Sequence, residues 1–153
     1  MARDGGSVSI EVAVLAPAFI GLMVLAGVAG RTAVADEAVE SAAHDAARAA
    51  SIARDARTGR SDATDAARRQ LDWSGLRCTA PPALDFHGSV GSTETGFAAA
   101  YRSAPGVPAT VTVTVTCTVS FDDLRAPGLP LALNRKTVSA SFTSPLDTYR
   151  SRG

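Results

Sequence analysis

An uncharged apolar run near the start of the chain limits its possible folds more than any other feature. Residues 12–30 read VAVLAPAFIGLMVLAGVAG, 19 residues without Asp, Glu, Lys or Arg. As an α-helix this run extends about 28 Å, close to the hydrocarbon thickness of a bilayer. Arg31 ends the run, and Pro17 lies inside it, which membrane helices tolerate. We expect one membrane-spanning helix and, beyond it, a single small domain of roughly 120 residues.

The same run is also compatible with a cleaved secretory signal peptide. In that case Ala33-Val34-Ala35 would supply the small residues of the cleavage site. However, the core of a signal peptide spans about 7–15 residues, and Glu11 lies where such a core would begin. We therefore expect a retained anchor. A mature protein that starts at Asp36 would indicate the signal peptide instead.

The helical pattern continues beyond Arg31. Small apolar residues recur at three- and four-residue spacing, and most charged residues lie away from their stripe; the stripe comprises Ala35, Val39, Ala42, Ala46, Ala49 and Ala53. Thr58-Gly59 fits a helix end, because glycine readily adopts a left-handed conformation. We expect residues 7–30 to span the membrane and residues 31–58 to extend the same helix. The stripe fits a narrow core face or a surface for neighbouring membrane helices.

The rest of the chain predicts a second helix and an antiparallel sheet. Ser61 or Asp62 would cap a helix that ends near Trp73. Residues 74–106 are rich in Gly, Ser, Thr and Pro, which predicts a loop with one short strand near residues 83–87.

The clearest strand is ATVTVTVTCTVSF, residues 109–121, with Val, Cys and Phe on one face and Thr on the other. Its threonine face would be solvated or, at a sheet edge, available for assembly. Residues 136–143 alternate too, so we expect these two strands to pair antiparallel. The predicted fold is α+β, a long N-terminal helix packed by a small antiparallel sheet.

Cys78 and Cys117 are the two cysteines of the chain. Two thiols alone make a poor zinc site, and no histidine lies at ligand spacing from either of them. An even count in a domain outside the cytoplasm favours a disulfide, and two buried free thiols are the alternative. A bridge that closes a loop of about 40 residues stabilises the fold by about 4 kcal/mol.

The sequence contains no recognisable catalytic or nucleic-acid-binding motif. Fifteen basic residues balance 15 acidic ones, so no basic surface for nucleic acid is expected. His44, on the polar face of the first helix, and His87, in the predicted loop, are far apart in the sequence and have no motif around them. Asp122-Asp123 fits a turn better than a cation site. We therefore expect no enzyme activity, no cofactor and no resident metal.

Glu11 is unusual, because a carboxylate at the start of a membrane span costs free energy. It either reaches the lipid headgroups or has a role in assembly. Residues 6–17 read GSVSIEVAVLAP, with Gly6 five positions before Glu11. This resembles the processing site of type IV prepilins and pseudopilins, in which prepilin peptidase cuts after a glycine and leaves a glutamate fifth. The resemblance implies residues 1–6 as a leader and Ser7 as the first mature residue, where true pilins commonly have phenylalanine.

The same segment is similar to the opening of TadE-like proteins of the Tad (tight adherence) pilus system. Residues 10–13 and Pro17 occupy the Val-Glu-Phe-Ala and proline positions of that pattern, with Val12 in place of phenylalanine. The similarity is strong over residues 5–50, is weak in the middle of the chain, and returns at residues 144–150.

This resemblance implies a structural subunit with a pilin-like fold that assembles a Tad-type pilus or secretion system. Residues 59–153 would form the extracytoplasmic domain, and the chain would cross the bacterial cytoplasmic membrane once or enter the pilus. Implied partners are prepilin peptidase, other pilus subunits, the Tad inner-membrane assembly proteins and the lipid bilayer. Glu11 would pair with the Ser7 amine of an adjacent subunit. The alternative is a membrane-anchored binding module or a cell-wall-associated protein.

Overall fold

The computed structural model describes residues 7–121 and 135–149, with side chains from residue 12 onward. The predicted turn at Asp122-Asp123 and the leader through Gly6 lie outside the described residues. The helices and strands, in chain order, are α1 Ser7–Ile52, α2 Ala56–Trp73, β1 Ala83–Val90, β2 Thr93–Gly96, α3 Phe97–Tyr101, β3 Ala109–Ser120 and β4 Arg135–Pro145. The predicted α+β class and the pilin-like plan are confirmed.

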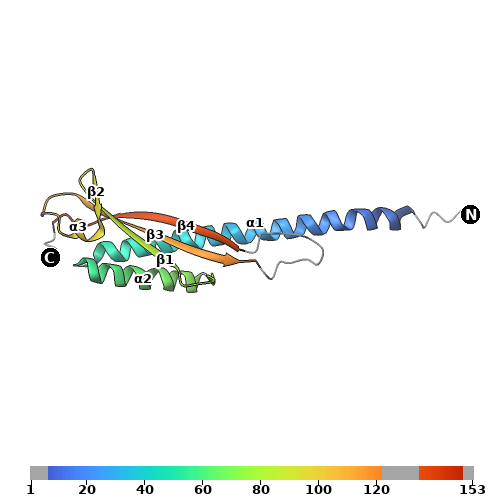
Figure 1. Ribbon diagram of the computed structural model, residues 1–153, viewed down its shortest axis with the longest axis horizontal. Helices are drawn as coiled ribbons and strands as arrows, with labels where there is room; N and C mark the ends of the chain where they lie inside the picture. The colour runs from blue at the N-terminus through green and yellow to red at the C-terminus, as the bar shows by residue number, and fades with distance from the viewer. Residues whose placement is uncertain (1–6, 122–134, 150–153) are drawn as a thin grey trace, which may run out of the picture.

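Helix α1 belongs to two environments. Its N-terminal half projects beyond the rest of the molecule, and its C-terminal half packs inside the domain (Figure 1). No side chain between residues 12 and 30 is buried. By length and composition, the apolar part of α1 can cross a membrane. From Ala35 onward one side of the same helix enters the hydrophobic core. A single continuous helix therefore joins the apolar segment to the domain.

Helix α1 ends earlier than the sequence predicted. It stops at Ile52, and α2 begins at Ala56, so the expected helix end at Thr58-Gly59 and the cap at Ser61 or Asp62 are wrong. Asp55 caps α2 instead: its carboxylate accepts hydrogen bonds from the backbone N–H groups of Arg57 and Thr58, each at 2.9 Å.

Gly59 lies inside α2 and is buried. The Tyr101 hydroxyl occupies the space where a side chain at position 59 would point. That hydroxyl donates a hydrogen bond of 2.5 Å to the Ala50 carbonyl at the end of α1. The glycine therefore serves close packing between three helices, and it does not terminate one.

Asp55→Ala should destabilise the turn between α1 and α2, because Asp55 satisfies N–H groups that the first turn of α2 leaves without partners. The pKa of Asp55 is lowered from its ordinary value of 3.8. The main cause is the hydrogen bond from the Thr58 backbone N–H, followed by the one from the Thr58 hydroxyl. The stabilisation is therefore complete above that value and is lost as pH falls through the lower pKa of the folded state.

Thermal unfolding of the wild type and two variants, measured from pH 7 to pH 2, tests this cap. Asp55→Ala should unfold at a lower temperature than the wild type near neutral pH, and the difference should shrink in acid. Asp55→Asn keeps an acceptor oxygen but cannot titrate, so it should retain most of the stability at all pH values. Equal unfolding temperatures for the wild type and Asp55→Ala at pH 7 would contradict the capping role.

The four strands form one antiparallel sheet in the order β2-β1-β3-β4. The predicted antiparallel pairing of the last two strands is confirmed, with Cys117 opposite Val138. Since β3 pairs on both sides, its threonine face does not lie at a sheet edge. The hydroxyls of this face instead bond across strands, as in Thr112 with Thr143 at 2.7 Å and Thr118 with Thr137 at 3.0 Å.

Residues 74–106 are more ordered than their composition predicted. They contain β1, β2 and α3, and the expected short strand extends to Val90. Gly91, with φ of +60°, turns the chain between β1 and β2, a conformation that glycine adopts without strain. Gly88 leaves room for α3, because the Ala100 methyl group and the Gly96 carbonyl lie where its side chain would be.

The core lies between one face of the sheet and the two long helices. Val111, Val113 and Val115 of β3 are completely buried, and alanines of α1 and α2 pack in the same cluster. Small residues on α1 let it lie close to the branched side chains of the sheet, and α2 packs mainly against α1. At one end of this core the predicted disulfide joins Cys78 to Cys117, with their Cα atoms 5.4 Å apart.

Candidate functional site

The N-terminal part of α1 carries the residues that the sequence singled out for processing and assembly. Ser7 begins the helix, and Glu11 follows four residues later on the same continuous helix. Residues at this spacing share one helix face. Gly6 and the side chains of residues 7–11 lie outside the described part of the structure. Cleavage after Gly6 and charge pairing by Glu11 therefore stay predictions.

The apolar segment of α1 exposes large side chains along its length. Phe19 is 62% exposed, Leu22 62% and Met23 77%. Nothing lies within 4 Å of the positions that side chains would take at Gly21 and Gly30. In water such a surface is unfavourable, whereas in a bilayer it meets lipid, and its small residues let other helices approach closely. This surface is suited to lipid and to membrane helices.

The stripe of small residues further along α1 is buried over most of its length and partly exposed at Ala49. Ala35, Val39, Ala42 and Ala46 are buried in the core, as expected for a narrow core face. Ala49 is only partly buried and lines a groove between α1 and α2.

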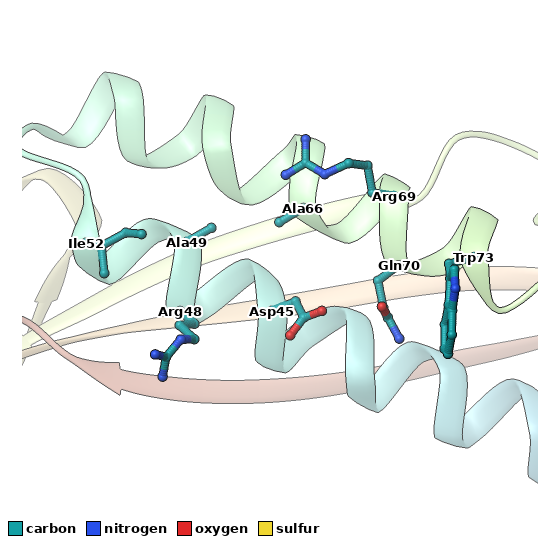
Figure 2. A pocket seen from close by; sticks show the side chains of 8 residues that line it. All are labelled: Asp45, Arg48, Ala49, Ile52, Ala66, Arg69, Gln70 and Trp73. Carbon is teal, nitrogen blue, oxygen red and sulfur yellow. The ribbon is translucent and has the colours of Figure 1, made fainter.

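That groove is an open hollow of about 630 Å³ (Figure 2). Ile52 and Trp73 lie at its two ends and are 68% and 84% exposed. Asp45, Arg48 and Arg69 also line it. Its charged groups come from both helices and do not converge on one point (Figure 2). The groove therefore has the features of a contact surface, and it lacks those of a catalytic pocket. In the sequence, Trp73, the single tryptophan of the chain, indicated only the end of the second helix.

The two histidines lie on different sides of the domain. His44 is on the polar face of α1, as predicted; its ring contacts Phe142 edge-on at 4.5 Å, and its Nδ1 lies 3.2 Å from Asp45. His87, which was predicted in a loop, lies in β1 beside a hollow on the hydroxyl-rich face of the sheet. Within residues 12–121 and 135–149, no three His, Cys, Asp or Glu side chains are placed to hold a metal ion.

Comparison with known proteins identifies the N-terminal part of the chain. The sequence model of the TadE-like protein family matches residues 6–48, which confirms the resemblance seen in the sequence. The match begins at the predicted processing glycine and ends inside the part of α1 that packs in the domain. A search of curated proteins and a search of solved structures found no match.

Proposed function

We propose that this chain, TadE-like over residues 6–48, is a pseudopilin-type structural subunit in the assembly of a Tad-type pilus or secretion system. The observation that carries the proposal is the family match over residues 6–48, of which residues 7–48 belong to one uninterrupted helix. The chain would be anchored by residues 7–30, with its domain outside the cytoplasm, and would act through contacts with lipid, with Tad inner-membrane assembly proteins and with other subunits.

Two properties of the described residues support a structural role. Among the described residues, none of the side chains between residues 12 and 30 is buried, so the apolar segment of α1 is available to neighbouring helices or lipid. The disulfide also supports a location outside the cytoplasm, because disulfides persist in oxidising compartments. Ala35, which would end a signal peptide, packs in the core with 1% of its surface exposed, and this favours a retained helix.

Cleavage after Gly6 by a prepilin peptidase tests the proposal directly. When the chain is expressed together with its cognate peptidase, the mature protein should begin at Ser7, as measured by intact mass and N-terminal sequencing. Gly6→Leu should block cleavage, because a branched side chain there would hinder access of the peptidase to the backbone. Gly5→Leu makes the same change one residue earlier and serves as the matched control, which should still be cleaved.

Two results would contradict this proposal. An N-terminus at Asp36 would show that the apolar run is a signal peptide. Equal cleavage of the Gly6→Leu and Gly5→Leu variants would show that the peptidase does not recognise Gly6.

A further inference from the structure

The structure fixes how far the domain lies from the apolar segment. The Lys136 ammonium is 3.9 Å from the Asp36 carboxylate, and this ties the start of β4 to α1. Asp36 follows Gly30 by six residues on the same helix, a rise of about 9 Å. Ser120, the last residue of β3, pairs with Arg135 at this end of the sheet. This end of the sheet is therefore the end nearer to the apolar segment of α1.

Helix α2 brings a second group of residues to the same end. It returns along α1 toward the N-terminal half of the molecule (Figure 1). Gln70 shares a hollow with Glu37 and Glu40 of α1. Trp73 is the last residue of α2, about one helical turn closer to the apolar segment. In the loop that follows α2, the N–H of Thr79 donates to the Thr118 carbonyl at 2.7 Å, so this loop also lies near the end of β3.

The side chains at this end suit the headgroup layer of a bilayer. Trp73 is 84% exposed, although exposing an indole to water is unfavourable. Tryptophan concentrates at membrane interfaces, where its ring is partly apolar and its N–H stays hydrated. Arg77 and Arg135 are exposed here too. Arginine side chains are long enough to bring their charged group to lipid phosphates while the stem lies along apolar surface.

The charges at this end are mixed. Asp36, Glu37 and Asp72 accompany Arg31, Arg77, Arg135 and Lys136. The described charges alone therefore do not select a lipid, and the exposed indole is the more specific feature of this end.

We propose that the end of the domain formed by Trp73, Arg77 and Arg135 rests on lipid headgroups, with Trp73 as its interfacial anchor. The proposal rests on the proposed function, because it requires α1 to be inserted in a membrane. Continuity carries the argument: β4 begins beside Asp36, about 9 Å along α1 from the end of its apolar run, and Trp73 lies about one helical turn beyond Gln70, which shares a hollow with Glu37 of α1. The headgroup layer adds roughly 5–8 Å beyond the hydrocarbon on each side of a bilayer, and the indole and arginine side chains span the remaining distance.

The single tryptophan makes the test direct, since the full-length chain needs no added label. The chain is reconstituted into vesicles of phosphatidylglycerol and phosphatidylethanolamine, and Trp73 fluorescence is quenched with lipids that carry a spin label on the headgroup. The matched control is Trp73→Phe combined with Tyr149→Trp. Tyr149 is 93% exposed and shares a hollow with Ser51 and Ile52 at the C-terminal end of α1, which is the end away from the apolar segment.

We expect blue-shifted emission from Trp73 and several-fold stronger quenching by headgroup labels than for the control tryptophan. Emission and quenching equal to the control, in vesicles where flotation shows that α1 is inserted, would overturn this proposal alone. Protection from acrylamide that grows with the protein-to-lipid ratio, without headgroup quenching, would show that a second copy covers Trp73 and would also overturn it. Failure of the chain to float with vesicles would instead count against the membrane anchor, and so against the proposed function.

Discussion

Glu11→Gln should impair piliation and the co-purification of other pilus subunits, while leaving membrane insertion and cleavage after Gly6 nearly unchanged. After cleavage, Ser7 carries a positive amine, and Glu11 offers the opposite charge one helical turn away. In an assembly the carboxylate would meet the amine of an adjacent subunit at low dielectric. Leaving one member of such a buried pair without its partner costs about 3–5 kcal/mol, equivalent to more than a hundredfold loss in association.

The measurement combines electron microscopy of pili with co-purification of other pilus subunits, in a deletion strain that carries each variant. Glu40→Gln makes the same chemical change on the exposed face of α1 and should leave piliation normal. Processing at Ser7 is measured in parallel, so that a maturation defect is not mistaken for an assembly defect. Normal pili and normal partner recovery with Glu11→Gln would remove the main physical support for an assembly role of this glutamate.

Removal of the disulfide should cost the domain about 4 kcal/mol of unfolding free energy, because the reduced chain regains the freedom of a long loop. The bridge joins residues separated by 39 positions. Small domains are stable by about 5–15 kcal/mol, so this loss is a large share of the total. Cys78→Ala and Cys117→Ala should each show it as increased protease sensitivity and a lower midpoint of denaturant unfolding.

Position 117 offers an internal control. Cys117 is buried with 1% of its surface exposed, whereas Cys78 is only partly buried. Cys117→Ala should therefore be at least as destabilising as Cys78→Ala, since it also leaves a small cavity. The double variant should lose little more than Cys117→Ala, because the crosslink is removed only once. Two alkylatable thiols in exported wild-type protein would contradict the bridge.

The sequence predicted well those elements that a repeating pattern within the element itself specifies. The apolar run, the small-residue stripe and the alternation of β3 each specify an element without help from the rest of the chain. The end of α1 does not. No glycine or proline lies between Arg31 and Thr58, so no helix breaker marks the stop at Ile52. It depends on the Asp55 cap and on the contact of Tyr101 with Ala50, a residue 51 positions away.

The secondary structure of residues 74–106 was underestimated for a related reason. Their Gly, Ser and Pro content is typical of loops, yet Gly91 and Ser92 form a two-residue connection, a recognised hairpin signal that the sequence contained. Gly88 looks like a strand breaker in sequence, but it is what lets α3 pack against β1. Trp73 could not be identified as a surface feature, because its exposure depends on where α2 ends relative to α1.

The continuity of α1 has a mechanical consequence. With no linker between the apolar segment and the sheet, a pull along the helix axis reaches the domain without slack. Moving α1 along its axis by one helical turn would shift the sheet by about 5.4 Å, and rotating α1 about its axis would rotate the sheet through the same angle. Any machinery that draws the N-terminal segment out of a bilayer would thus move and orient the whole domain in a single stroke.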